Sequence, residues 1–307
     1  MGTESIAGLF LTPDIQVRKA DGALYLEANQ GLGKMPASVL SYLYHWAQER
    51  PETTFLAERN SADPRQWDRI SYAETLARSR SLAAVLAVAG VSPQRPLMML
   101  SGNSISFALL TLAAMMINAP VVPVSPSYSL LSADFGKVRY IHDQVNPGLV
   151  FAQDAETFQG VLRMLRELGT PLLTQGPETV GITTLEQLLA DGASRDDDRP
   201  LPVSEPDTVA KILFTSGSTG MPKGVVNTQR MLVSNQEAIA AIWPFLAQPG
   251  HVFLDWLPWH HTYGGNHNFH MALRNGASLF IDAGKPTPEG IETTLVNLAE
   301  ISPTLYF

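Results

Sequence analysis

The hydrophobic pattern alternates between short apolar runs and longer stretches in which apolar residues recur at helical spacing. Short apolar runs bounded by turn residues predict buried strands, and the helical spacing predicts amphipathic helices. The expected strands are 53–57, 96–100, 121–124, 149–151, 209–214, 252–257, 278–281 and 304–307. The expected helices are 38–50, 72–89, 105–117, 133–145, 156–168, 229–246, 266–273 and 289–299.

The helix expected after residue 71 has the clearest boundary signals. Ser71 and Glu74 form a capping-box pattern at its start, and Gly90 is placed to end it. The alternation of strands and helices along the chain predicts an α/β fold, with mostly parallel sheets flanked by helices on both faces.

The same pattern predicts three regions. Residues 1–36 are expected to be irregular, with a hairpin around 23–29, and two α/β subdomains should follow at 37–202 and 203–307. The polar stretch 191–202, with aspartates at 196–198, fits a solvated linker better than a metal site. Because the last expected strand begins at 304 and the chain stops at Phe307, the second subdomain is expected to be truncated.

Composition narrows the class of protein. The net charge of −8 and the pI of about 5.4 disfavour nucleic acid as a partner, although backbone N–H groups could still hold the phosphates of a nucleotide. The absence of cysteine excludes a disulfide framework and a cysteine nucleophile. The first ten residues lack signal-peptide features, and Asn118, Pro120 and Pro123 interrupt the most apolar stretch. A cytoplasmic protein without a membrane partner is therefore expected.

The most specific chemistry lies in residues 212–224, where an apolar strand leads into a run of hydroxyl residues and glycines. Gly217 and Gly220 let the main chain approach a ligand closely. Lys223 can add a charge for a phosphate oxygen. Hydroxyl donors come from Thr215, Ser216, Ser218 and Thr219. The set predicts an anion cradle for a polyphosphate between a strand and a helix. The alternative is an ordinary Gly/Ser-rich turn.

This segment differs from the common P-loop. Counting on from Gly217 places Pro222 where that motif requires its second glycine. The loop is therefore a different kind of phosphate site.

A second cluster, residues 254–270, contains four of the seven histidines and two of the five tryptophans. One interpretation is a metal site, although no His-Glu-x-x-His pattern is present. Its candidate ligands are His260, His261, His267 and His270. A second interpretation is packing at a strand-to-helix corner, which fits His270 best.

A third interpretation of this cluster is the wall of a binding pocket. A strand running to Pro258 would deliver His261 and Tyr263 at the carboxyl end of the sheet, where open α/β sheets bind ligands. Trp259 and the pair Gly264 and Gly265 suit a flat aromatic substrate that packs closely against backbone.

The segment Thr215-Ser-Gly-Ser-Thr-Gly-Met-Pro-Lys-Gly224 resembles the signature loop of the acyl-adenylate-forming superfamily, which includes acyl- and aryl-CoA synthetases. The resemblance extends to residues 70–74, 113–126 and 205–210, so it covers most of the chain from about Ser38. Asn118-Ala-Pro120 departs from the family, which more often has a glycine there. The amino-acid sequence of residues 259–268 resembles a segment in the N-terminal part of bacterial feruloyl-CoA synthases.

The resemblance implies that an aryl acid of the hydroxycinnamate type, such as ferulate, is activated by ATP as an acyl-adenylate and then joined to CoA. Mg²⁺ would accompany ATP without a protein metal site in this chain. Lys223 and His261 would be the catalytic residues. Lys223, the backbone N–H groups of 217–220 and the hydroxyls of Thr215 and Thr219 would hold pyrophosphate. His261 would shape the acyl site and reorient between the two half-reactions. Tyr263, Gly264 and Gly265 would bind the substrate.

Three elements of the family are not found here: a Tyr-Gly-x-Thr-Glu segment, a Thr-Gly-Asp segment and a C-terminal swivelling domain. The chain is therefore expected to be an N-terminal fragment with impaired activity of its own. A non-catalytic nucleotide- or acyl-binding module acting with a partner is the alternative, and a histidine-based metallohydrolase is a third hypothesis. Benzoates and medium-chain acids stay open as substrates, and a homodimer is one option for assembly.

Overall fold

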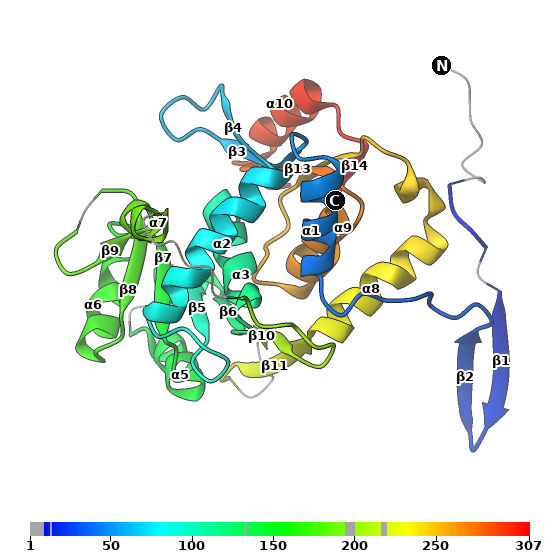
Figure 1. The fold of residues 1–307 in the computed structure, drawn as a ribbon, viewed down its shortest axis with the longest axis horizontal. Helices are drawn as coiled ribbons and strands as arrows, with labels where there is room; N and C mark the ends of the chain where they lie inside the picture. The colour runs from blue at the N-terminus through cyan, green and yellow to red at the C-terminus, as the bar shows by residue number, and fades with distance from the viewer. Residues whose placement is uncertain (1–8, 13, 133, 178, 194–199, 216–219) are drawn as a thin grey trace.

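The computed structural model describes residues 9–12, 14–132, 134–177, 179–193, 200–215 and 220–307. Two large sheets hold most of the described strands, and a separate hairpin projects near the N-terminus (Figure 1). The seven-stranded sheet runs, in spatial order, β11 (Lys223–Thr228), β10 (Val209–Thr215), β6 (Val121–Val124), β5 (Leu97–Leu100), β7 (Leu149–Asp154), β8 (Leu172–Gln175) and β9 (Thr183–Thr184). The five-stranded sheet runs β14 (Leu305–Tyr306), β12 (Val252–Asp255), β13 (Ser278–Ile281), β3 (Thr54–Arg59) and β4 (Trp67–Ser71).

The helices connect these strands. They are α1 (Leu40–Glu49), α2 (Tyr72–Val88), α3 (Ile105–Met116), α4 (Pro126–Leu130), α5 (Gly136–Val145), α6 (Gln159–Glu167), α7 (Leu185–Ala193), α8 (Gln229–Ile242), α9 (Phe269–Arg274) and α10 (Ile291–Ile301), with the 3₁₀ turn η2 (Pro244–Ala247) and the π-helical turn η3 (Tyr263–Asn268). Most strand pairs in the two sheets are parallel, and β10–β11 and β3–β4 are antiparallel. The expected α/β fold with mostly parallel sheets is confirmed.

The signals at the start of α2 form the expected capping box. The Ser71 hydroxyl accepts a hydrogen bond from the Glu74 backbone N–H at 3.2 Å, and the Glu74 carboxylate accepts one from the Ser71 N–H at 2.8 Å. Gly90 follows the helix with a φ of +96°, a conformation that favours glycine.

The most apolar stretch forms α3, every residue of which is buried, followed by β6. Helix α3 contacts β6 in one sheet and β3 in the other, so its whole circumference needs apolar residues. Among the described residues, no helix combines the length and the apolar character that crossing a membrane requires.

The boundary expected between residues 202 and 203 does not separate the two sheets. The seven-stranded sheet adds β10 and β11 to strands from the first half, and the five-stranded sheet adds β3 and β4 to strands from the second half. Because parallel strands need long crossover connections, strands adjacent in space come from distant parts of the chain. The two halves are therefore interleaved.

Two local expectations are refined near the N-terminus and before β10. The hairpin consists of β1 (Ile15–Ala20) and β2 (Ala23–Ala28), joined at Asp21 and Gly22, which both have positive φ as a two-residue hairpin turn requires. Helix α7 extends into the expected linker 191–202, and the aspartates at 196–198 lie outside the described residues.

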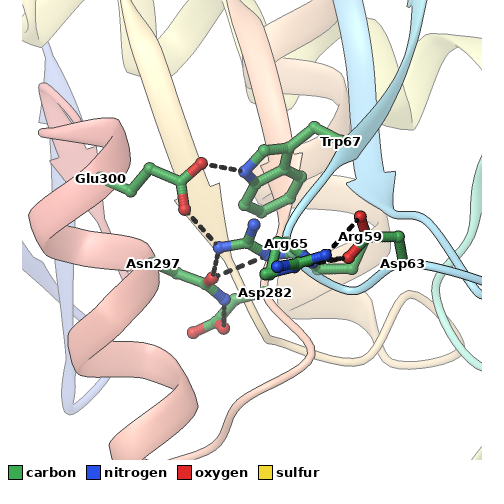
Figure 2. A network of polar contacts seen from close by, with 7 residues as sticks. All are labelled: Arg59, Asp63, Arg65, Trp67, Asp282, Asn297 and Glu300. Carbon is green, nitrogen blue, oxygen red and sulfur yellow. Dashed lines mark hydrogen bonds and ion pairs between the residues drawn. The ribbon is translucent and has the colours of Figure 1, made fainter.

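A polar network fixes α10 against the β3–β4 hairpin (Figure 2). The Arg59 guanidinium on β3 donates to the Asn297 side-chain oxygen at 2.5 Å and to the Glu300 carboxylate at 2.7 Å. Asn297 donates to Asp282 at 2.7 Å, and the Trp67 indole N–H donates to Glu300 at 2.9 Å. This network orients α10, which leads directly into β14 and Phe307.

Candidate functional site

The predicted phosphate loop connects the two strands of an antiparallel hairpin. Thr215, the last residue of β10, is opposite Lys223, the first residue of β11, and both are exposed. Gly220 has a φ of +98°, so a side chain there would be strained. The remaining predicted loop residues, Ser216, Gly217, Ser218 and Thr219, lie outside the described residues.

The expected strand-to-helix arrangement of this loop is wrong. The chain enters β11 directly after Pro222, and α8 begins only at Gln229, with Thr228 as its N-cap. Val225 and Val226 are β-branched and pair with β10, which explains the strand. Lys223 therefore lies at the end of a hairpin strand and not at the N-terminus of a helix.

The histidine-rich segment forms a turn after β12 and then the π-helical turn η3. Asn103, which precedes α3, fixes the turn: its side chain donates to the Leu257 carbonyl at 2.9 Å and accepts from the Trp259 N–H at 2.8 Å. His261 is exposed, and Tyr263 is 45% exposed. The two residues predicted to form the pocket wall are therefore both accessible to a ligand.

The aromatic side chains around Tyr263 form a small accessible wall. The Tyr263 ring stacks on the His267 ring with centroids 4.7 Å apart. Phe307 meets both rings edge-on, at 6.1 Å from Tyr263 and 5.7 Å from His267. Phe307 follows β14, so two segments that are distant in sequence, η3 and the residue after β14, meet at one aromatic surface.

Gly264 and Gly265 are both buried against the turn that precedes them. A Cβ at Gly264 would collide with the carbonyl oxygens of Leu257 and Pro258, and a Cβ at Gly265 would collide with the Trp259 carbonyl. The close backbone approach expected of this pair is therefore made with the chain itself. Their role in substrate binding stays a prediction.

Trp259 supports the turn from inside the core. It is 1% exposed and packs between Phe107 and Phe269, with ring centroids 5.7 and 4.9 Å away. Its indole N–H points to the Asp255 carboxylate at 3.4 Å. Burial raises the pKa of Asp255 to about 6, an effect that a hydrogen bond from Asn268 opposes.

Three side chains from neighbouring elements hold η3 in place. Lys211 on β10 donates from its ammonium to the Gly265 carbonyl at 3.0 Å. Asn227 on β11 accepts from the Asn266 side-chain amide at 2.9 Å. Gln236 on α8 donates to the Asn266 carbonyl at 2.8 Å. The turn that carries the predicted pocket wall is thus hydrogen-bonded to both strands that flank the predicted phosphate loop.

The sequence pattern did not identify these three residues. The sequence does contain a signal for Lys211, because a charged residue inside an apolar strand pattern is unusual. Asn227 and Gln236 carry no such signal, since polar residues are ordinary at a strand end and on a helix.

Lys211 should make the stability of the fold depend on pH above neutrality. Burial lowers its pKa from the usual 10.5 to about 7, because the charged form is poorly solvated. Between pH 7 and 10 the unfolded chain therefore holds a proton that the folded chain has lost. The unfolding free energy should rise with pH by up to about 1.4 kcal/mol per unit. Urea unfolding at pH 7.0 and 8.5 measures this rise.

The variant Lys211→Met is the matched comparison for that measurement. Without the titrating amine, its unfolding free energy should change much less between the two pH values. An equal rise in both proteins would show that other groups cause the pH dependence.

The four candidate metal-binding histidines have different environments. His270 is fully buried, which confirms its packing role, and burial keeps its pKa well below the usual range. Burial, and then the neighbouring His261, lower the pKa of His260 to about 4. His267 bonds to the Asn268 side chain at 2.7 Å. In the part of the chain that the structure describes, no group of three or more His, Asp or Glu could hold a metal ion.

A cavity of about 850 Å³ lies elsewhere, between α1, α2 and the segment that precedes β10. Arg80, Tyr44 and Leu201 are among the residues that line it, and none of the predicted site residues does. The size of this cavity alone indicates no ligand or reaction. The hairpin end and the η3 wall therefore remain the candidate site.

Comparisons with known proteins identify relatives of the chain. The model of the family described as AMP-binding enzyme matches residues 43–307. Sulfoacetate–CoA ligase of Cupriavidus necator is 34% identical over 166 residues, which are 53% of this chain and 29% of that protein. 4-Coumarate–CoA ligase 3 of Oryza sativa is 28% identical over 215 residues, which are 69% of this chain and 37% of that protein.

Solved structures share the fold. ATP-bound MatB from Rhodopseudomonas palustris superposes with a TM-score of 0.69 at 24% identity, over 89% of this chain and 49% of that one. The chain thus spans about a third of these curated relatives and about half of MatB.

Proposed function

The chain belongs to the AMP-binding enzyme family, and we propose that it serves the ATP-dependent activation of a carboxylic acid, followed by transfer of the acyl group to CoA. The acid we propose is an aryl acid of the hydroxycinnamate type, with ferulate as the first choice. Relatives named as CoA ligases, including one for 4-coumarate, support the reaction class.

The observation that carries the proposal is the junction between the hairpin end and the η3 wall. Thr215 and Lys223 are paired at the hairpin end, and Lys211 and Asn227 bond the same two strands to η3. A nucleotide held at the hairpin and an acid held at the wall would therefore be bound on one connected unit. Fixed positioning of two reactants is a large part of catalysis in such reactions.

The proposed chemistry has two balanced steps. A carboxylate oxygen attacks the α-phosphorus of ATP, the bond from that phosphorus to the bridging oxygen breaks, and pyrophosphate leaves. The CoA thiol then loses its proton to solvent and attacks the acyl carbonyl carbon, and AMP leaves. Lys223 would stabilise the charge on the departing phosphates, with Thr215 donating its hydroxyl.

His261 would act by position in this scheme. It is exposed at the start of the turn, two residues before Tyr263. We propose that it stands between the acid and the nucleotide. Mg²⁺ would enter with ATP, bound through the phosphates, and would neutralise part of their charge.

The choice of an aryl acid rests on the aromatic wall. Tyr263 and His267 are stacked, and the Phe307 ring stands nearly perpendicular to both. Flat aromatic rings gain from stacked and edge-to-face contacts, typically about 0.5–1.5 kcal/mol per pair beyond burial. A saturated chain of similar size would lack this contribution.

Calorimetric titration of the chain tests the proposal. Ferulate, benzoate and decanoate are titrated with the Mg²⁺ complex of a non-hydrolysable ATP analogue present. We expect ferulate to bind at least about tenfold more tightly than decanoate, which corresponds to one or two aromatic contacts. Preference for decanoate would overturn the aryl choice, and failure to bind any acid or the nucleotide would overturn the activity.

A further inference from the structure

A fully buried lysine on β10 has no role in the proposed chemistry. Lys211 is 2% exposed, and its neighbours around a small internal space are Phe107, Thr111, Trp259 and Phe269. Burial lowers the pKa of Lys211 because the charged form is poorly solvated in the core. An apolar side chain would fill this position at lower energetic cost.

What the lysine gains is one hydrogen bond. Its Nζ donates to the Gly265 carbonyl at 3.0 Å, inside the π-helical turn η3. A neutral amine retains an N–H, so this bond can persist on both sides of neutrality. A buried carbonyl that loses its hydrogen-bond partner destabilises the folded state by about 1–3 kcal/mol. Losing the bond from Lys211 should therefore destabilise the turn.

The position of Lys211 along β10 connects two parts of the site. It precedes Thr215 by four residues, and its bond reaches the turn that carries Tyr263 and His267. Asn227 makes the matching contact from β11, four residues after Lys223. π-helical turns are rare and occur frequently at functional sites. The contacts from Lys211 and Asn227 are therefore expected to set the position of the pocket wall.

We propose that Lys211 is a positioning residue, which fixes the η3 wall at a set distance from the phosphate-loop hairpin. The inference rests on the proposed function for the role of the two segments as acid and nucleotide sites. The bond itself is independent of that function.

The test compares Lys211→Met with the wild-type chain. Calorimetry with ferulate and with the Mg²⁺ complex of a non-hydrolysable ATP analogue gives the two dissociation constants. Hydrogen exchange of peptides that cover 261–270 reports the order of η3 without any ligand. We expect ferulate affinity to fall about tenfold, as for one buried hydrogen bond, with the nucleotide constant within about twofold. Exchange in η3 should accelerate, with α5 unchanged.

Two further variants keep the test decisive. Lys211→Gln retains a donor and should recover part of the ferulate affinity and of the exchange protection, even if Lys211→Met is less stable. Lys137→Met removes an exposed lysine on α5 and should match the wild type. The inference would be overturned if η3 of Lys211→Met exchanged hydrogen at the wild-type rate. It would also be overturned if the variant lost affinity equally for ferulate and for the nucleotide. If the wild type binds neither ligand, the proposed function fails, while the exchange result still decides whether Lys211 orders η3.

Discussion

Replacing Lys223 by alanine should weaken binding of the ATP analogue on the order of a hundredfold, because one ammonium–phosphate contact is lost. Lys223 is exposed at the first position of β11, opposite Thr215. Its side chain can therefore reach a ligand at the hairpin end while the backbone of β11 stays paired with β10. Calorimetric titration at two salt concentrations measures the loss, which should shrink at high salt as the charge is screened.

The controls for this prediction separate charge from folding. Because Lys223 is exposed, the alanine variant should keep the thermal midpoint of the wild type and its affinity for ferulate alone. Lys19→Ala removes an exposed lysine from β1, in the hairpin that projects away from the two sheets (Figure 1), and should bind the nucleotide normally. If Lys223→Ala bound the ATP analogue with the wild-type dissociation constant, the phosphates would have to bind at another part of the chain.

The sequence predicted the buried strands best. Strands β6 and β13 have the predicted bounds, 121–124 and 278–281, because each is a short apolar run that ends at turn residues. Strand β11 was missed, since Val225 and Val226 stand in a polar context and become a strand only through pairing with β10. Its formation depends on a partner that periodicity does not reveal.

The sequence also indicated the candidate site residues, whose roles stay predictions. The loop composition indicated Thr215 and Lys223, and the cluster after β12 indicated His261 and Tyr263, all of which are exposed. The π-helical turn was not predictable. Its support comes from Lys211, from Asn227 and from Gln236 on α8, whose separation in sequence from η3 hides the contacts.

Gly265→Ala should lower the free energy of unfolding by about 3 kcal/mol or more, because the added methyl group has no space. Its Cβ would meet the Trp259 carbonyl, which is backbone and cannot swing away as a side-chain end can. The Trp259 backbone is itself fixed by the hydrogen bond from its N–H to Asn103 at 2.8 Å. Urea unfolding of the variant measures the change.

Gly33→Ala is the matched control, because nothing lies within 4 Å of a Cβ built at Gly33 and its φ is not positive. It should stay within about 0.5 kcal/mol of the wild type. Gly265 also has no positive φ, so its loss of stability would reflect space rather than backbone conformation. A Gly265→Ala protein as stable as the control would mean that η3 can shift away from Trp259. Lys211 could then not hold the Gly265 carbonyl in place, and the wall would not be fixed relative to the hairpin.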